Sequence, residues 1–351
     1  MTLRVSLSGA QRALTRPAQN AHQGWNEREA CVVTLRGDCG ISGSGEASPL
    51  PGFSPDRLED CVATLRELEL LNVPDRLAAG QFALVELSRV SSRLPAQLPA
   101  ARAALEAALL DLWSRCEGRP AWALLAPALA SPAPRAIAAL LMGEPEQAAA
   151  QAQRAQARGI RSFKLKIGRP GALDRELSAV AELRRALGPV ARLRLDANRS
   201  LSVPLARAYL PRFAEHELEY VEEPCAAGEF GQLADLAVPF AWDESLATGE
   251  LPANPLRALV LKPTLLGGIS ACAKWAEHAA RIGAEVIISH TFDGPLGLAL
   301  SATLALSWGS ESMAHGLDLD GARLAPEAVP YLSGAELHAW SEPGFGIAGS
   351  S

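Results

Sequence analysis

Residues 162–168 have the sequence Ser162-Phe163-Lys164-Leu165-Lys166-Ile167-Gly168, in which two lysines lie two positions apart in a mostly apolar run. In a β-strand, residues i and i+2 point to the same face, so the two lysines share a face and the apolar residues take the other. Two adjacent ammonium groups lower each other's pKa, and a lysine that is partly neutral near pH 7 can act as a base. The alternative is an edge strand with a solvated lysine face, which this stretch alone does not exclude.

Short apolar segments recur from about residue 135 onward, and segments with helical periodicity separate them. We expect strands near residues 136–141, 162–167, 192–196, 218–222, 239–242, 258–261, 285–288 and 312–315, with helices between them such as 172–187 and 268–281. This alternation predicts an α/β fold, a (β/α)8-type (TIM-like) barrel. A doubly wound open sheet is the alternative, but no Gly-x-Gly-x-x-Gly motif follows a first strand.

The first third of the chain has a different pattern, which predicts an α+β capping domain over residues 1–120. Residues 3–9 and 29–47 are typical of strands, and Ser54-Pro55 fits the start of a helix that continues to about residue 70. A second helix is expected from Ala100 to Cys116, with one apolar stripe. We place the barrel domain at residues 135–320 and expect the Gly-, Pro- and Ser-rich tail, about 322–351, to fold back and complete the capping domain.

Polar residues with reactive side chains recur where the expected barrel strands end. These residues are Lys164 and Lys166, Asp196 and Asn198, Glu222 and Glu223, Asp243 and Glu244, Lys262, and Ser289 with His290. Because the reactive groups of such barrels lie at the carboxyl ends of the strands, we expect these side chains to surround one site.

Three of the acids, Asp196, Glu222 and Asp243, end three successive strands, one strand–helix step apart. Adjacent strands lie about 4.7–4.9 Å apart, so the three carboxylates can converge on one hard divalent cation, Mg²⁺ in the first instance with Mn²⁺ as a substitute. Alternatively, each acid caps the helix that follows it. Glu223 and Glu244 are expected to point away from the ion, either to support the metal ligands from behind or toward an inter-strand pair, although spacing alone does not decide which acid of each pair binds metal. Lys262 ends the sixth strand, roughly opposite the second, so Lys166 and Lys262 can flank a substrate.

Composition excludes several classes of partner. The 351 residues carry a formal net charge of −6 and lack a dense basic cluster, which argues against nucleic acid. No apolar run approaches the ~20 residues of a membrane span, and six scattered cysteines without a C-x-x-C pair suit a reduced, cytoplasmic protein without a secretion signal. A small-molecule substrate is the expected partner, and a homo-oligomer is compatible with the sequence.

Several motifs give the chain a resemblance to the enolase superfamily, in its muconate-lactonizing-enzyme-like branch, over nearly the whole length. Besides the Lys-x-Lys strand, they are Gly45-Glu46-Ala47-Ser48-Pro49-Leu50-Pro51-Gly52-Phe53-Ser54, Ala104–Leu112, Arg194–Arg199, Glu222-Glu223-Pro224-Cys225, Trp242-Asp243-Glu244-Ser245 and Lys262–Gly268. Within that branch the chain most resembles the o-succinylbenzoate synthases of menaquinone biosynthesis, which are carbon–oxygen lyases.

The resemblance implies roles for single residues. Asp196, Glu222 and Asp243 would bind Mg²⁺, and Lys166 would be the acid/base. Lys164 would support Lys166, and Lys262 would lie across the substrate. Arg194, Asn198, Glu244, Ser289 and His290 would contact the substrate or support the site. The implied reaction is syn-dehydration of 2-succinyl-6-hydroxy-2,4-cyclohexadiene-1-carboxylate to o-succinylbenzoate through an enolate.

Two other activities fit the same residues. A dipeptide epimerase or N-acylamino acid racemase would use both Lys166 and Lys262 as bases on opposite faces, and a non-catalytic barrel would only bind a metal or an anion. The segment Ser289-His290-Thr291-Phe292-Asp293-Gly294-Pro295 departs from the synthase pattern. His290 either contacts the substrate carboxylate or forms a hydrogen bond within its own loop. The segment Gln19–Trp25 is expected to face the substrate, with Trp25 closing over it.

Overall fold

A computed structural model describes residues 1–19, 23–38, 40–74, 80–249, 255–322, 324 and 329–347 of the chain. Part of the segment 19–25 and part of the tail, about which the sequence makes predictions, therefore lie outside the described residues. Among the helices described, none has both the length and the apolar character to cross a lipid bilayer.

The N-terminal part of the chain forms a four-stranded antiparallel sheet in the order β3-β2-β1-β4. Its strands are β1 (Thr2–Gln19), β2 (Gly24–Gly37), β3 (Ser42–Ala47) and β4 (Leu70–Asn72). The long helix α3 (Pro99–Cys116) packs against β3. This close approach depends on Gly43 and Gly45, because a Cβ at either position would come within 2.4 Å of the α3 backbone.

The N-terminal part contains three further helices: α1 (Leu58–Arg66), α2 (Gln81–Ser91) and α4 (Ala121–Leu125). The expectation that the first of them begins at Ser54 is wrong. Ser54 instead accepts a 2.9 Å hydrogen bond from the Leu50 amide, which holds a turn ahead of the helix. The expectation of a single apolar stripe on α3 is also wrong, since its side chains are buried nearly all round, between the sheet and the rest of the protein.

Seven parallel strands follow in the described part of the chain, in strictly sequential order. They are β6 (Ala138–Leu141), β7 (Ser162–Lys166), β8 (Arg192–Asp196), β9 (Leu218–Glu222), β10 (Phe240–Trp242), β11 (Ala258–Leu261) and β12 (Glu285–Ile288). The eighth strand expected at 312–315 is reduced to two parallel bridges, in which His315 pairs with Ile137 and Gly316 with Ser289. These bridges join the first strand of the sheet to the last, so the predicted (β/α)8-type barrel with an N-terminal α+β capping domain is confirmed.

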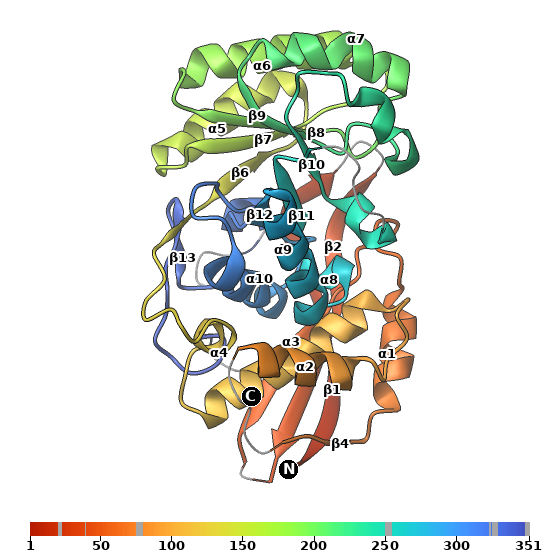
Figure 1. Ribbon diagram of the computed structural model, residues 1–351, viewed down its shortest axis with the longest axis vertical. Coiled ribbons are helices and arrows are strands. Elements are labelled where there is room, and N and C mark those ends of the chain that lie inside the picture. The colour runs from red at the N-terminus through yellow and green to blue at the C-terminus, as the bar shows by residue number, and fades with distance from the viewer. Residues whose placement is uncertain are drawn as a thin grey trace.

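Helices on the outside of the barrel connect the strands: α5 (Ala148–Ala157), α6 (Leu173–Leu187), α7 (Val203–Ala214), α8 (Pro263–Leu266), α9 (Ile269–Ile282) and α10 (Pro295–Trp308). Short 3₁₀ segments, Ala227–Leu233 and Glu244–Thr248, follow β9 and β10 instead of full helices. A last short helix, α11 (Leu319–Ala322), follows the closing segment. Figure 1 shows the parallel strands with α5, α6 and α7 above, and the N-terminal sheet with α1, α2 and α3 below.

The described part of the tail returns to the N-terminal helices. The Phe345 amide donates a 2.9 Å hydrogen bond to Asp111 of α3, and the indole of Trp122 in α4 donates to the Trp340 carbonyl at 3.0 Å. Two short strands, β13 (Leu332–Ser333) and β14 (Glu336–Leu337), extend from β5 (Arg135–Ala136). The domain boundaries themselves, at about residues 120, 135 and 320, stay a prediction.

Candidate active site

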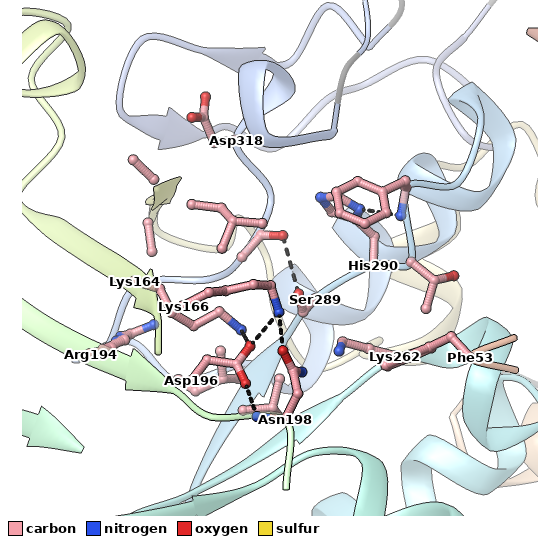
Figure 2. Close-up of a pocket in the computed structure, with 18 of the residues that line it drawn as sticks. Phe53, Lys164, Lys166, Arg194, Asp196, Asn198, Lys262, Ser289, His290 and Asp318 are labelled. Carbon is pink, nitrogen blue, oxygen red and sulfur yellow. Dashed lines mark hydrogen bonds and ion pairs between the residues drawn. The ribbon is translucent and has the colours of Figure 1, made fainter. Parts of the chain in front are cut away.

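A cavity lies at the carboxyl ends of the barrel strands and is lined by residues from both parts of the chain (Figure 2). The N-terminal part contributes Gln19, Trp25, Leu50 and Phe53. The barrel contributes both lysines of β7, Arg194, Asp196, Asn198, Lys262, Ser289, His290, Phe292 and Asp318, among others. The capping sheet therefore closes the open end of the barrel over its polar strand ends.

Strand alternation places the β7 lysines in this cavity. Phe163 and Leu165 are buried in the core on the other face, whereas Lys164 and Lys166 line the cavity with their side chains 15% and 11% exposed. This confirms the expected shared face and excludes a solvated edge strand, because β7 lies between β6 and β8.

Lys164 is surrounded by carboxylates. Its Nζ donates to Glu222 Oε1 at 2.9 Å and lies 3.3 Å from Asp196 Oδ2. Burial lowers the pKa of Lys164, but the negative charges of Glu222, Asp196 and Asp243 outweigh burial and raise its pKa well above the ordinary value. The expectation that the neighbouring lysine lowers the pKa of Lys164 is therefore wrong, because the opposite charges are closer and more numerous.

Lys166 points at the end of the next strand. Its Nζ donates to Asp196 Oδ2 at 2.9 Å and to Asn198 Oδ1 at 2.7 Å. The Asn198 amide group in turn donates to Glu244 Oε1 at 2.6 Å, which orients Asn198 toward the lysine. Burial raises the pKa of Asp196, but Lys166 and Lys164 outweigh this effect and hold it below the usual range.

Lys262 approaches from the other side of the cavity. In Figure 2, Lys164 and Lys166 enter from one side and Lys262 from the opposite side, as the position of its strand predicts. Its ammonium group forms an ion pair with Asp243 and lies 5.2 Å from the ring centroid of Phe53, a cation–π contact supplied by the capping part. A planar substrate between the lysines would meet an amine on each face.

Asp196 and Glu222 are register partners on β8 and β9, and Asp243 directly follows β10. In their present conformations, no group of three or more His, Cys, Asp or Glu side chains in the described ranges is arranged to hold a metal ion. Each of the three carboxylates instead faces a lysine ammonium group. Two of the acids, Asp196 and Glu222, therefore meet at one cation, the ammonium group of Lys164.

The donor set nevertheless fits a divalent cation. With Glu223 and Glu244 included, these strand ends carry five carboxyl groups and three lysines, so two negative charges are left over when all eight groups are ionised. Asp243 Oδ1 and Glu244 Oε2 are buried and have no hydrogen-bond partner among the described residues, which is costly for carboxylate oxygens. All the oxygens are hard ligands of the type that Mg²⁺ prefers.

Glu223 points toward the neighbouring strand, one of the two expected orientations. It accepts hydrogen bonds from the amides of Asp243 and Ser245 at 2.8 and 2.9 Å and from the Ser245 hydroxyl at 2.6 Å. Burial and the charge of Glu244 raise the pKa of Glu223 to about 7. The backbone of Glu223 has a φ of 45°, in the left-handed region that residues other than glycine seldom adopt. The hydrogen bonds of its side chain to Asp243 and Ser245 help to hold this conformation.

Arg194 lies deeper in the barrel and also lines the cavity. Its Nε donates to Glu219 Oε2 at 2.5 Å, its Nη1 donates to the Ala314 carbonyl at 2.7 Å, and its guanidinium stacks on Tyr220. Its Nη2 is buried and has no partner in the part of the chain that the structure describes, so this donor is available to a bound anion.

The end of β12 supplies a further wall. Ser289 and His290 both line the cavity, and His290 Nδ1 accepts a 2.9 Å hydrogen bond from the Phe292 amide. The expected hydrogen bond of His290 within its own loop is therefore present, and its contact with the substrate stays a prediction. Burial lowers its pKa to about 3, so the ring is neutral at physiological pH. Trp25 covers the cavity from the capping side, and its ring centroid lies 6.1 Å from that of Phe292.

Asp318 and Phe292 are among the cavity residues that the sequence does not predict. Asp318 follows the barrel-closing segment, and its Oδ2 lies 2.9 Å from Arg158 Nη2 in an ion pair. Phe292 forms part of the aromatic wall of the cavity. The strand-end rule that selected the other acids also applies to Asp318, but the expected eighth strand ended too early to include its neighbourhood. Phe292 has no such local signal.

Two family models match the chain. "Mandelate racemase / muconate lactonizing enzyme, N-terminal domain" matches residues 4–126, and "Enolase C-terminal domain-like" matches residues 147–350. An o-succinylbenzoate synthase from Yersinia enterocolitica is 31% identical over 313 residues, covering 85% of this chain and 84% of the relative. A hydrophobic dipeptide epimerase from Roseobacter litoralis is 30% identical over 258 residues, covering 71% and 73%.

A solved structure gives the same fold. The dipeptide epimerase from Methylococcus capsulatus, complexed with Mg and the dipeptide L-Arg-D-Lys, superposes with a TM-score of 0.81 at 24% identity and 99% coverage of both chains. The capping sheet lies in the residues that the first family model matches, and most of the barrel lies in those that the second matches. The chain belongs to the enolase superfamily, whose members are Mg²⁺-binding enzymes, with mandelate racemase / muconate lactonizing enzyme N- and C-terminal domains.

Proposed function

We propose that the protein is an o-succinylbenzoate synthase, a lyase of menaquinone biosynthesis that dehydrates 2-succinyl-6-hydroxy-2,4-cyclohexadiene-1-carboxylate. The observation that carries the proposal is the placement of Lys166 and Lys262 on opposite sides of one cavity, each paired with a strand-end carboxylate. The similarity to the Yersinia synthase over 85% of the chain supports this reaction among those of the superfamily.

Asp196, Glu222 and Asp243 are the residues that we propose to hold Mg²⁺. When bound, the ion would neutralise their charge and stabilise the dianionic enolate by several kcal/mol. Lys164 would then remain as a supporting cation next to the ligands. Asn198 and Glu244 would orient Lys166 through the chain of hydrogen bonds that ends on its ammonium group.

Lys166 is the proposed acid/base. As a free amine, its Nζ takes the proton from the carbon that bears the substrate carboxylate, and the C–H electrons form the enolate. The resulting ammonium then gives the same proton to the departing hydroxyl group, so water leaves from the same face and the ring becomes aromatic. Lys262 stays protonated and stabilises the enolate by charge and by a cation–π contact. Arg194, Ser289 and His290 are the proposed contacts of the substrate's polar groups.

The second candidate is a dipeptide epimerase, and Asp318 favours it. Its carboxylate lines the cavity, in a position where the ammonium group of a dipeptide could bind. The pairing of Asp318 with Arg158 weakens this argument, because the arginine already balances the charge. A non-catalytic metal- or anion-binding barrel is the third candidate, and the complete set of lysines and acids disfavours it.

The test is a Mg²⁺-containing incubation of the purified protein with the cyclohexadiene, with the product identified by mass spectrometry. We expect loss of one water and formation of o-succinylbenzoate. A parallel incubation with hydrophobic dipeptides in D₂O tests the second candidate. Deuterium incorporation with inversion at the α-carbon, without dehydration of the cyclohexadiene, would replace the proposed function with epimerisation.

A further inference from the structure

A cluster of two arginines and two acids, buried except for the half-buried Arg12, lies where the capping sheet meets the loop after β12. Arg12 on β1 and Arg28 on β2 face Glu46 at the end of β3 and Asp293 in the loop. Arg28 is 3% exposed and Asp293 is 1% exposed, and Glu46 is buried as well. Burial of so many charges is costly unless they are paired, so the cluster constrains both of the parts that it joins.

Arg28 connects a capping loop to the barrel loop. Its Nη1 donates to the Pro49 carbonyl at 2.9 Å, its Nη2 donates to the Ser48 hydroxyl at 2.8 Å, and its Nε donates to the Phe292 carbonyl at 3.3 Å. Arg12 adds a second donor, with its Nη2 2.9 Å from the same Phe292 carbonyl. One carbonyl of the barrel loop is therefore held by two guanidinium groups from two strands of the capping sheet.

The residue held in this way has an unusual backbone. Phe292 has a φ of 55°, in the left-handed region that residues other than glycine seldom adopt. Its amide is fixed by His290 Nδ1 at 2.9 Å and its carbonyl by the two arginines. Such conformations persist where the surroundings over-determine them, often at functional sites.

Glu46 holds the next part of the same loop. Its Oε1 accepts a 2.6 Å hydrogen bond from the Gly294 amide, immediately before α10. Gly294 itself has no side chain to cap that helix, so a carboxylate from the capping sheet occupies the place of a helix cap. A Cβ at position 294 would lie 2.4 Å from Glu46 Oε2, which explains why glycine suits this contact.

The held segment forms one wall of the cavity. His290, Thr291 and Phe292 all line it, and the Phe292 ring packs beside Trp25 at a centroid distance of 6.1 Å. None of the three lies among the lysines or the acids that we assign to the chemistry. The wall therefore affects how the substrate is held rather than how its proton is moved.

We propose that Arg28, together with Arg12, is a positioning residue that fixes the Phe292 backbone and thereby sets the substrate-facing wall formed by His290, Thr291 and Phe292. The identity of the substrate in this inference rests on the proposed function, whereas the link between Arg28 and the Phe292 backbone does not. The capping sheet then acts on substrate binding through two arginines that do not line the cavity.

The structural link is tested by hydrogen–deuterium exchange of the peptide that covers residues 290–297. In the Arg28→Met variant this peptide is expected to exchange faster than in the wild type, while peptides of β7 and β8 stay unchanged. Arg28→Lys keeps the charge but cannot reproduce the three-point contact, so it should be intermediate and serves if the methionine variant does not fold. Arg36→Met, an exposed arginine on the same strand, is the matched control.

The functional consequence is tested by steady-state kinetics. Arg28→Met should raise KM at least roughly tenfold with kcat nearly unchanged, because the wall contributes binding and the lysines remain in place. Phe292→Gly removes the ring and accepts the left-handed backbone without strain. In that background, Arg28→Met should raise KM little further, since both substitutions disturb the same wall.

Unchanged exchange of residues 290–297 in both Arg28 variants would overturn the structural link, whatever the substrate is. Faster exchange with an unchanged KM, or fully additive effects of the Arg28 and Phe292 substitutions, would overturn the positioning role. A wild type that exchanges as expected but does not dehydrate the cyclohexadiene would refute the proposed function alone. If the wild type then epimerises a dipeptide in D₂O, the kinetic comparison is made with that dipeptide.

Discussion

Lys166 and Asp196 are register partners on adjacent parallel strands, and their side chains meet at 2.9 Å between Nζ and Oδ2. The proposed base and one proposed metal ligand therefore face each other from the first and second of four consecutive strand ends, those of β7, β8, β9 and β10. A cation bound by Asp196 would compete with the ammonium group for the carboxylate, so metal binding and release of the amine are coupled in this arrangement.

Replacement of Lys166 by alanine is expected to lower kcat by at least roughly 10³-fold, because no other group in this geometry replaces its proton transfer. Mg²⁺ should still bind, since Lys166 contributes no ligand. The measurements are steady-state turnover and calorimetric titration with Mg²⁺. Lys274→Ala, on the outer helix α9, is the control and should keep wild-type activity. A Lys166→Ala variant with a near-native rate would remove this residue from the mechanism.

Chelation of the metal is expected to abolish turnover reversibly. Without a dication, the excess carboxylate charge around Asp243 and Glu244 disfavours a further negative charge on the substrate. Treatment with EDTA followed by gel filtration should give inactive protein, and added Mg²⁺ should restore the rate. Full activity in a protein shown to be free of metal would contradict the role of the ion.

The buried face of β7 should contribute strongly to stability. Phe163 is 1% exposed between the barrel strands and their helices, so Phe163→Ala is expected to lower the free energy of unfolding by about 3–5 kcal/mol. Phe82→Ala is the matched control, because Phe82 is 72% exposed and its loss should cost less than about 0.5 kcal/mol. Urea unfolding measures both. Similar losses in the two variants would mean that Phe163 does not pack in the core as described.

His315 should make stability depend on pH. Burial lowers its pKa to about 3, while its Nδ1 accepts from the Ile288 amide at 3.0 Å, so the folded state holds the ring neutral. The unfolded chain takes up the proton near pH 6.5, and the stabilisation is therefore present above that pH and lost as the pH falls toward 3.

The expected slope from this group is about 1.4 kcal/mol per pH unit between these limits. His315→Asn can keep an acceptor for the Ile288 amide but cannot be protonated. Free energies of unfolding measured from pH 6 to pH 4 should therefore fall less steeply in the variant than in the wild type. Parallel curves would show that His315 does not titrate on unfolding in this range.

Much of the fold follows from local sequence patterns. The alternation of apolar strands and amphipathic helices was sufficient to predict the barrel, because each strand–helix step has its own periodicity. The eighth strand was harder to predict, since residues 312–316 pair only at His315 and Gly316. The first capping helix begins later than the sequence predicts, because Ser54 caps a turn rather than the helix.

The site was predictable to the extent that strand ends meet at one edge of a parallel barrel. That rule brings Lys166, Asp196 and Lys262 to one cavity without knowledge of their partners. It does not give the charge balance, so the direction of the Lys164 pKa shift was predicted wrongly. Contacts between distant segments, such as Arg12 with Phe292, 280 residues apart, leave no local signal at all.

The most direct test of the central claim is a crystal structure of the protein soaked with Mn²⁺, with the ion located by anomalous scattering. We expect one strong peak within coordinating distance of Asp196, Glu222 and Asp243, with Lys166 Nζ displaced from Asp196 toward the cavity. A peak bound elsewhere, or no ordered ion while the three acids remain paired with the lysines, would show that these acids do not form the metal site.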